Sequence, residues 1–202
     1  HSSIVSLKNR DSNFIINSGR YGFYRVQYDA NSLAQLELLI DEKILNHVDR
    51  WSLQNDLFSQ CVSGTKQIQE YLDFTTSYHD EDNYITLQNL AQNLYHLYKL
   101  TRKEKFSDEI RTYTAQFLGT IFDRLGWDSQ KNEKHTNALL RSFVITALGK
   151  LGDKEILNEA KKRFNKFLKN KNSLAADLQE PVFVLAAWQG DKKTYNKLLS
   201  LY

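Results

Sequence analysis

The sequence predicts an all-α fold preceded by a short β segment. Three observations predict this class. From residue 31 onward, apolar residues recur at the three- and four-residue spacing of one helix face. The 202-residue chain contains one proline and eight glycines, too few for a turn-rich β fold. Short runs of β-branched and aromatic residues are confined to the first 28 positions.

Three of these runs near the N-terminus have strand character. They are residues 4–8, 13–17 and 22–28. A sheet of three short strands is marginal unless it packs on other structure. We therefore interpret residues 1–28 as the end of a β domain that is mostly missing from this chain, and residues 29–202 as a helical domain.

The last of the three runs leads directly into helical periodicity, which predicts a strand-to-helix junction. Asp29 or Asn31 is expected to cap the first helix, because both residue types accept a hydrogen bond from the first turn. Phe23, Tyr24 and Tyr28 are expected to be buried at this junction, where each would stabilise the fold by roughly 1.5–3 kcal/mol.

Helical spacing of apolar residues continues to the end of the chain. The predicted helices cover residues 31–40, 49–64, 66–74, 83–99, 106–125, 133–151, 153–169, 179–189 and 191–201. The loops between them are short, so consecutive helices are expected to pack on one another.

An internal echo indicates a helical repeat. Residues 147–154 (ALGKLGDK) resemble residues 185–192 (LAAWQGDK), and residues 61–66 (CVSGTK) form a looser third copy. Each glycine can end one helix in the left-handed conformation, and the Asp or Thr that follows can cap the next. The spacing of 38 residues between the two Gly-Asp pairs is typical of HEAT or armadillo superhelices. Because residues 198–202 are still apolar, we expect the natural protein to continue beyond Tyr202.

The charge pattern argues against some classes of partner. The net charge is only +3, which does not favour nucleic acid, and no apolar run is long enough for a membrane span. The basic segment 161–171 is interpreted as a solvated helix face, and less readily as a patch for acidic partners. Cys61 is the single cysteine, so we expect a small buried apolar side chain in a reducing, cytoplasmic setting.

The residues that could carry chemistry do not form a recognisable active site. The five histidines do not form an H-E-x-x-H motif, and no G-x-S-x-G is present. The loop 79–82 (HDED) could hold a metal in principle, but it lacks the spacing of a calcium loop, so a solvated helix start is the preferred interpretation. No glycine-rich phosphate loop follows a strand, and Cys61 has no evident base.

One string nevertheless indicates a family. Residues 22–29, GFYRVQYD, closely resemble the G-[FY]-Y-R-V-x-Y-D signature of M1-family zinc aminopeptidases. Residues 49–56 (DRWSLQND) resemble the D-R-x-x-L-x-x-D segment of the same family. Later landmarks also match, at residues 61–64, 125–127, 140–141, 152–153, 174–178 and 190–191. The chain is most similar to the puromycin-sensitive and archaeal tricorn-interacting branch.

The resemblance implies the ERAP1-C-like C-terminal helical domain of such an enzyme, with residues 1–28 as strands of an upstream β-sandwich domain. In the family this domain encloses a peptide chamber and controls access to it. The parent enzyme removes N-terminal residues from peptides with a zinc-activated water. The G-A-M-E-N and H-E-x-x-H motifs lie upstream in the family, and neither occurs here. The resemblance therefore implies zinc in the parent, no cofactor or catalytic residue in this chain, and no activity of the chain alone.

The implied partners are the upstream catalytic and β-sandwich domains and peptide substrates, without nucleic acid or membrane. Three residues are candidates to face the chamber: Arg141, Tyr78 and Arg25. Four are candidates for structural contacts at the junction: Tyr24, Tyr28, Arg50 and Asp56, with an ion pair expected between Arg50 and Asp56. The alternative is a stand-alone helical-repeat adaptor that binds a protein partner, which requires a solenoid with polar ends.

Overall fold

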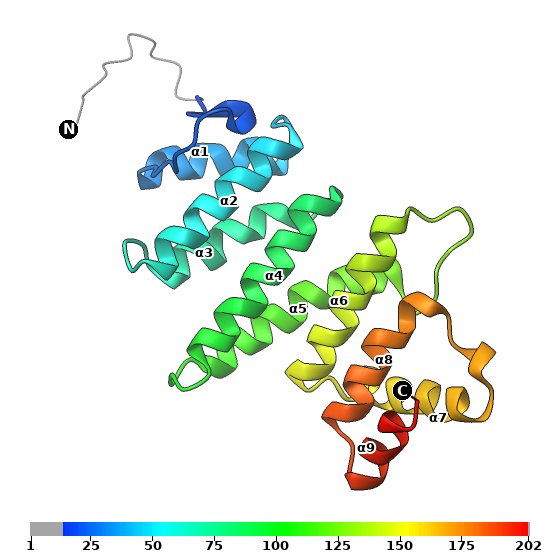
Figure 1. The fold of residues 1–202 in the computed structure, drawn as a ribbon. Coiled ribbons are helices and arrows are strands. Elements are labelled where there is room, and N and C mark those ends of the chain that lie inside the picture. Colours follow the sequence, from blue (N-terminus) through cyan, green and yellow to red (C-terminus); the bar gives the residue numbers. More distant parts are fainter. Residues whose placement is uncertain (1–13, 202) are drawn as a thin grey trace. The chain divides into compact units, whose positions relative to one another are not determined.

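A computed structural model describes residues 14–201 (Figure 1). Every regular element in that range is helical and no strand occurs there, so the predicted all-α class is confirmed. The described helices are α1 (Ala30–Asp41), α2 (His47–Val62), α3 (Ile68–Thr75), α4 (Tyr84–Thr101), α5 (Ser107–Leu125), α6 (His135–Leu151), α7 (Lys154–Lys169), α8 (Ala176–Trp188) and α9 (Lys192–Leu199). Three short 3-10 helices accompany them: η1 (Ser18–Arg20), η2 (Thr76–Tyr78) and η3 (Lys171–Ser173).

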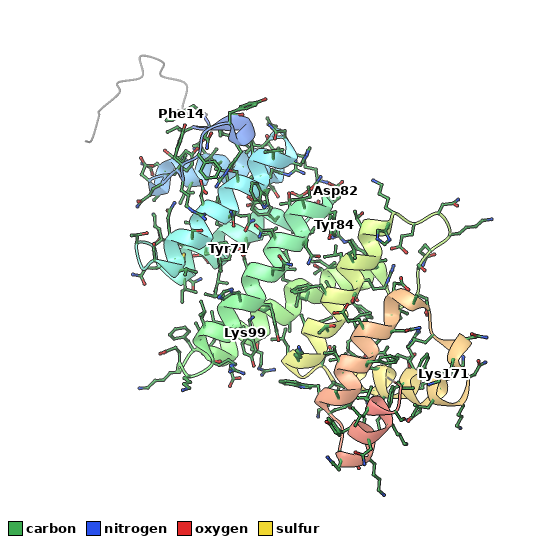
Figure 2. All side chains as sticks on the ribbon, viewed as in Figure 1. Phe14, Tyr71, Asp82, Tyr84, Lys99 and Lys171 are labelled. Carbon is green, nitrogen blue, oxygen red and sulfur yellow. The ribbon has the colours of Figure 1, made fainter. Side chains whose placement is uncertain are left out.

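The chain divides into two compact units, with the boundary inside α4 after Leu90. In unit 1, α2 packs on α3 and η1, and η2 packs on α1 and α3. Its core contains Tyr71, Phe74 and Tyr78, all essentially inaccessible to solvent. The rings of Phe74 and Tyr78 lie 5.8 Å apart. Figure 2 shows the side chains on the ribbon, with Tyr71 labelled on α3.

Unit 2 is built from α5 to α9 and the second half of α4. There α6 packs on α5, α7 and α8, while α8 also packs on α7 and α9. Val144 on α6 and Val182 on α8 are fully buried in this core. A Cβ atom on Gly149 would lie only 2.4 Å from Leu185 Cδ2, so the absence of a side chain there allows α6 and α8 to approach closely.

The predicted helix caps are largely confirmed. The Asp29 carboxylate accepts a hydrogen bond from Ser32 N, and Asp153 and Asp191 cap α7 and α9 in the same way. Gly152 ends α6 in the left-handed conformation, with φ of 97°. The prediction was wrong for Gly190, which has no positive φ.

Gly190 instead allows close packing, since a Cβ atom there would lie 2.5 Å from Ala186 O. Gly64 has the expected left-handed φ, 76°, but Thr65 does not cap the next helix. The N-cap of α3 is Gln67, whose backbone N–H donates to the Glu70 carboxylate. Asn46 caps α2, which therefore begins at His47 rather than near Asp49.

The strand predicted at residues 22–28 is not observed, and neither is a strand in the described part of 13–17. A strand needs a neighbouring strand for its backbone hydrogen bonds. Here the backbone polar groups of Val26 are satisfied by side chains of α2: Val26 N donates to Asp56 and Gln60 donates to Val26 O. The run predicted at residues 4–8 lies outside the described residues. None of the helices described by the structure is long and apolar enough to cross a membrane.

Candidate functional site

Residues 16–28, which we call the connector, are held on α2 by two buried carboxylates. Asp49 Oδ2 accepts a hydrogen bond from Ser18 Oγ at 2.8 Å, and Asp49 Oδ1 accepts one from Gly19 N at 2.6 Å. Seven residues further along α2, Asp56 accepts from Val26 N at 2.9 Å and from Arg20 Nη1 at 2.8 Å. A seven-residue spacing places both carboxylates on one face of the helix, which is why they hold the same segment.

The connector has an unusual backbone conformation within its tight turn. Asn17 and Arg20 have left-handed backbone φ values of 62° and 59°, which residues other than Gly rarely adopt. The Asn17 side chain stabilises the turn, because its Oδ1 accepts from Gly22 N at 2.6 Å and its Nδ2 donates to Gly22 O at 2.9 Å. At the end of the connector, the hydroxyl of Tyr28 accepts from Ile16 N at 2.9 Å. The connector is therefore fixed at several points along its length.

The aromatic side chains of the connector have two different environments. Tyr28 is buried, as predicted, and burial raises the pKa of its hydroxyl. Phe23 is fully exposed and Tyr24 is 53% exposed, so the prediction that they are buried was wrong in this chain. The reason is that α2 holds the connector through its backbone and through Arg20, which turns these two side chains and Tyr21 away from the helices.

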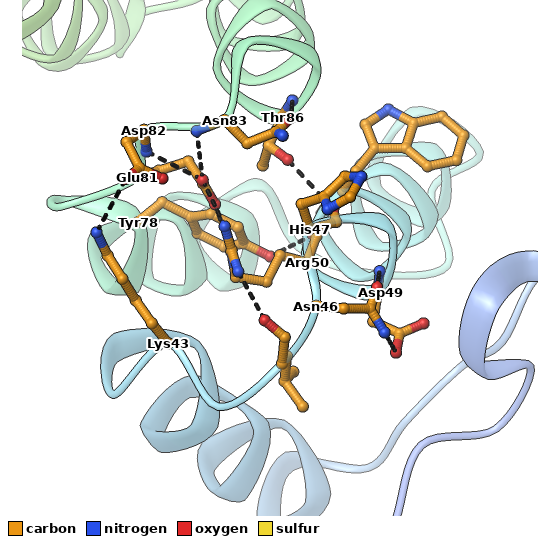
Figure 3. A network of polar contacts seen from close by, with 12 residues as sticks. Lys43, Asn46, His47, Asp49, Arg50, Tyr78, Glu81, Asp82, Asn83 and Thr86 are labelled. Atoms are coloured by element: carbon orange, nitrogen blue, oxygen red, sulfur yellow. Dashed lines mark hydrogen bonds and ion pairs between the residues drawn. The ribbon is translucent and has the colours of Figure 1, made fainter.

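A second polar network lies beside the start of α4 (Figure 3). Arg50 on α2 makes two parallel bonds to Glu81, from Nε to Oε2 at 2.6 Å and from Nη2 to Oε1 at 2.7 Å. Its remaining nitrogen, Nη1, donates to Leu45 O at 2.6 Å. Glu81 Oε1 also accepts from the amides of Asp82 and Asn83, so it orders the turn that starts α4.

The ion pair predicted between Arg50 and Asp56 is therefore wrong. A six-residue spacing rotates the two side chains by about 240° around one helix, so they lie on different faces. Arg50 pairs with Glu81, and Asp56 pairs with Arg20 and, at 3.5 Å, with Arg25. Both arginine partners of Asp56 come from the connector, so Asp56 bonds to that segment and not to Arg50.

The Arg50–Glu81 pair is almost inaccessible to solvent. Burial alone would raise the pKa of Glu81, but the hydrogen bonds and charge of Arg50 and the two backbone amides outweigh it, and the pKa is lowered. The hydrogen bond to Glu81 in turn raises the pKa of Arg50. Tyr78 is completely buried against the same turn and donates from its hydroxyl to Arg50 O at 2.7 Å; burial raises its pKa well above the ordinary value. The arrangement neutralises a buried charge and has no open position for a reactant.

In unit 2, a buried arginine holds the end of α5. Arg141 on α6 is 1% exposed, and its side chain donates to Leu125 O and Gly126 O, each at 3.1 Å, and to the Glu133 carboxylate. A cation at the last carbonyls of a helix is favourable for the helix dipole. Burial would raise the pKa of Glu133, but hydrogen bonds from the Gln130 amide and Arg141, with the charge of Arg141, lower it.

The three chamber candidates have different positions. Tyr78 and Arg141 are buried within unit 1 and unit 2, respectively. The Tyr78 hydroxyl and the Nε and Nη2 atoms of Arg141 donate to protein groups, whereas Arg141 Nη1 has no hydrogen-bond partner in the described range. The Arg25 side chain is 51% exposed, with Nη1 donating to Asn55 O at 3.2 Å. No hydrogen bond or ion pair joins Tyr78 and Arg25, the two candidates in unit 1, within the described residues. Arg25 is thus the one candidate of the three with an accessible guanidinium.

The acidic loop at residues 79–82 does not converge on a metal site. Glu81 points inward to Arg50, while His79 lies 3.2 Å from Asp41 and 3.3 Å from Asp80. Over the described range, no group of three or more His, Cys, Asp or Glu side chains could hold a metal ion. Cys61 is half-buried rather than fully buried, and burial raises the pKa of its thiol to about 11.

The sequence did not indicate the roles of Glu81 and Arg20. Glu81 belongs to a run of charged residues that is typical of a solvated loop, and its partner is 31 residues away. The only signal was Arg50 itself, an arginine close to the apolar residues Leu53 and Leu57 of its helix, which requires an acidic partner when it is buried. Nothing in the local pattern around Arg20 indicates that it reaches α2.

Comparison with known proteins places these features in a family. The sequence model of the ERAP1-like C-terminal domain family matches residues 13–202 of this chain. Aminopeptidase M1-A of Oryza sativa subsp. japonica is 27% identical over 209 residues, covering 100% of this chain and 24% of that protein. Aminopeptidase M1 of Arabidopsis thaliana is 31% identical, covering 93% of this chain and 22% of that protein. The puromycin-sensitive aminopeptidase of Caenorhabditis elegans is 26% identical, covering 92% of this chain and 20% of that protein. The chain thus spans less than a quarter of the length of these relatives.

Proposed function

The chain belongs to the ERAP1-like C-terminal domain family of M1 aminopeptidases, and from this we propose that it encloses the peptide chamber of a zinc-dependent parent enzyme and controls access to it. The observation that carries the proposal is the near-complete family match of a chain that spans less than a quarter of its relatives. The chemistry belongs to the rest of the parent, which supplies the zinc and removes N-terminal residues from peptides. In this proposal the chain forms part of the wall of the peptide chamber.

The connector supports a role in joining domains. In the proposed arrangement, residues 1–28 are the end of an upstream β-sandwich domain and residues 29–202 are the helical-repeat domain, of the HEAT kind. The aromatic residues Tyr21, Phe23 and Tyr24 are exposed here while the backbone beside them is fixed to α2. In the parent, these three side chains would pack against the upstream domains, which removes apolar surface from water. We propose a cytoplasmic parent, in keeping with the single cysteine of this chain.

Within this proposal, Arg25 is the residue that faces peptide substrates, because its guanidinium is accessible and its contacts to Asn55 and Asp56 leave other donors available. Tyr78 and Arg141 contribute by holding the helix ends that shape the wall. The test compares Arg25→Ala with wild type in the full-length parent enzyme. We expect the KM for peptides of eight or more residues to rise about tenfold, as for the loss of one charged hydrogen bond, while a single-residue chromogenic substrate is unaffected.

The matched control is Lys103→Ala, a change of exposed charge in the loop before α5, which should leave both substrates unchanged. An equal change in KM for long and short substrates would remove Arg25 from this role. The 202-residue chain itself, assayed with added zinc, should show no aminopeptidase activity. Zinc-dependent turnover by the pure chain would overturn the proposal as a whole.

A further inference from the structure

A groove lined by lysines runs between α7 and α9 in unit 2. Three adjoining hollows share Asn165, and the one lined by residues of α7, α8 and α9 holds about 390 Å³. The lysines that line them are Lys161, Lys162, Lys166 and Lys169 from α7 and Lys193 and Lys197 from α9. In Figure 1 these two helices lie together near the C-terminus, and Lys171, labelled in Figure 2, follows the end of α7.

The amphipathic sequence of α7 explains why the lysines face the groove. Phe164 and Phe167 are buried on the opposite side, where both pack on Phe183 of α8, with ring centres 5.9 and 5.0 Å apart. The remaining positions of α7 therefore point away from the core. Helix α9 is held beside them by its cap, in which Asp191 Oδ1 accepts from Thr194 N at 2.9 Å. The groove is thus a fixed feature of the packing of α7, α8 and α9.

The positive charge of the groove is not neutralised by the chain. Lys161, Lys166, Lys169, Lys193 and Lys197 form no ion pair with any residue in the described range. Lys162 is 78% exposed and has one contact, to Glu159 at 3.2 Å. The single carboxylate in the lining, Asp191, already accepts from Thr194 N and Thr194 Oγ1. The groove is thus lined by six lysines and by one carboxylate that already accepts hydrogen bonds from Thr194, in a chain whose net charge is only +3.

We propose that this groove binds an acidic segment of a polypeptide. The lysines of α7 extend from Lys161 to Lys169, roughly 12 Å along the helix, which matches about four residues of an extended peptide. A compact polyphosphate would instead favour converging arginines or a cluster of backbone amides, and no arginine lines the hollows. The amide of Asn165 lies at the centre, where it can pair with a peptide backbone, and Leu168 offers an apolar contact between the charges. This inference does not depend on the proposed aminopeptidase role.

The test measures binding of fluorescein-labelled hexaglutamate to the 202-residue chain by fluorescence anisotropy at low and physiological salt. We expect binding that weakens with salt, and a loss of about tenfold in affinity for the double variant Lys161→Glu/Lys197→Glu. The matched control, Lys103→Glu/Lys105→Glu, makes the same change in net charge on an exposed loop outside the groove and should alter affinity less than about twofold. Circular dichroism checks that each variant is folded.

Two further arms separate a specific groove from general attraction. Asn165→Ala leaves the charge unchanged and should weaken hexaglutamate about threefold, the effect of one modest hydrogen bond. Tripolyphosphate and a thymidine oligonucleotide, added as competitors at equal charge, should displace hexaglutamate poorly. Stronger displacement by either one, equal loss in the control double variant, or no binding of hexaglutamate by the folded chain would each overturn the proposal.

Discussion

Replacing Glu81 with Gln tests the claim that the Arg50–Glu81 pair holds unit 1 together. The substitution keeps the size of the side chain, and its carbonyl oxygen can still accept from the amides of Asp82 and Asn83. It removes the negative charge and places an NH₂ group against one of the two Arg50 nitrogens. Arg50, whose side chain is only 9% exposed, then carries a charge without a carboxylate.

The expected loss is about 3 kcal/mol in the free energy of unfolding, because removing one member of a buried ion pair leaves the other charge uncompensated. The neighbouring carboxylate provides a matched control. Asp82 is 72% exposed and lies 3.6 Å from Lys43, so Asp82→Asn should cost no more than about 0.5 kcal/mol. The double variant Arg50→Met/Glu81→Gln should lose less than the two single variants together, since it removes the buried charge.

Urea unfolding followed by circular dichroism gives the free energies, and hydrogen exchange read by mass spectrometry locates the loss in α2 and the start of α4. The pH dependence adds a second check. The pKa of Glu81 is lowered in the folded state, so its contribution is present above the ordinary carboxyl range and is lost as the pH falls through the lowered value. The difference between wild type and Glu81→Gln should therefore shrink in acid. Equal losses for Glu81→Gln and Asp82→Asn, or a difference that does not change with pH, would refute the reasoning.

Three other outcomes follow from the structure. Gly119→Ala lies in the middle of α5, where the new Cβ would meet no other element within 4 Å, and it should raise the free energy of unfolding by up to about 1 kcal/mol. Gly152→Ala, at φ of 97°, should lower it by about 1 kcal/mol. Denaturant unfolding measures both. Cys61 should react with iodoacetamide at pH 8 many times more slowly than free cysteine, because burial raises its pKa to about 11; equal rates would show that the thiol is accessible. Tyr28→Ala should lower the free energy of unfolding by about 3 kcal/mol and increase hydrogen exchange in the connector, and an unchanged melting temperature would contradict a buried Tyr28.

Helix positions could be predicted from this sequence because a helix with one buried face has apolar residues every three or four positions. The predicted segment 106–125, for example, differs from α5 by one residue, since Ile110, Leu118 and Ile121 are all buried on one face. Helix α8 was predicted to start at residue 179 and starts at Ala176, a difference that periodicity near a proline does not resolve. Glycine conformations were harder to predict, because Gly152 and Gly190 share a motif but only Gly152 is left-handed.

The polar contacts were mostly not predictable. Arg50 and Glu81 are 31 residues apart, and their pairing depends on how α2 meets the turn before α4. The connector was misjudged for a different reason. Aromatic residues such as Phe23 and Tyr24 favour strands, yet strand formation depends on a partner strand, and sequence propensity alone does not indicate one.

The manner in which α2 holds the connector has a consequence for sequence variation. Asp49 and Asp56 bond to the amides of Gly19 and Val26, groups that nearly every amino acid possesses. The exposed side chains between these anchor points, those of Tyr21, Phe23 and Tyr24, are therefore free to change without loosening the attachment, while the two aspartates are not. A saturation mutagenesis scan should show this asymmetry, with tolerance at positions such as Phe23 and intolerance at Asp49 and Asp56. The surface displayed by the connector can thus diverge to suit a neighbouring domain while its anchorage stays constant.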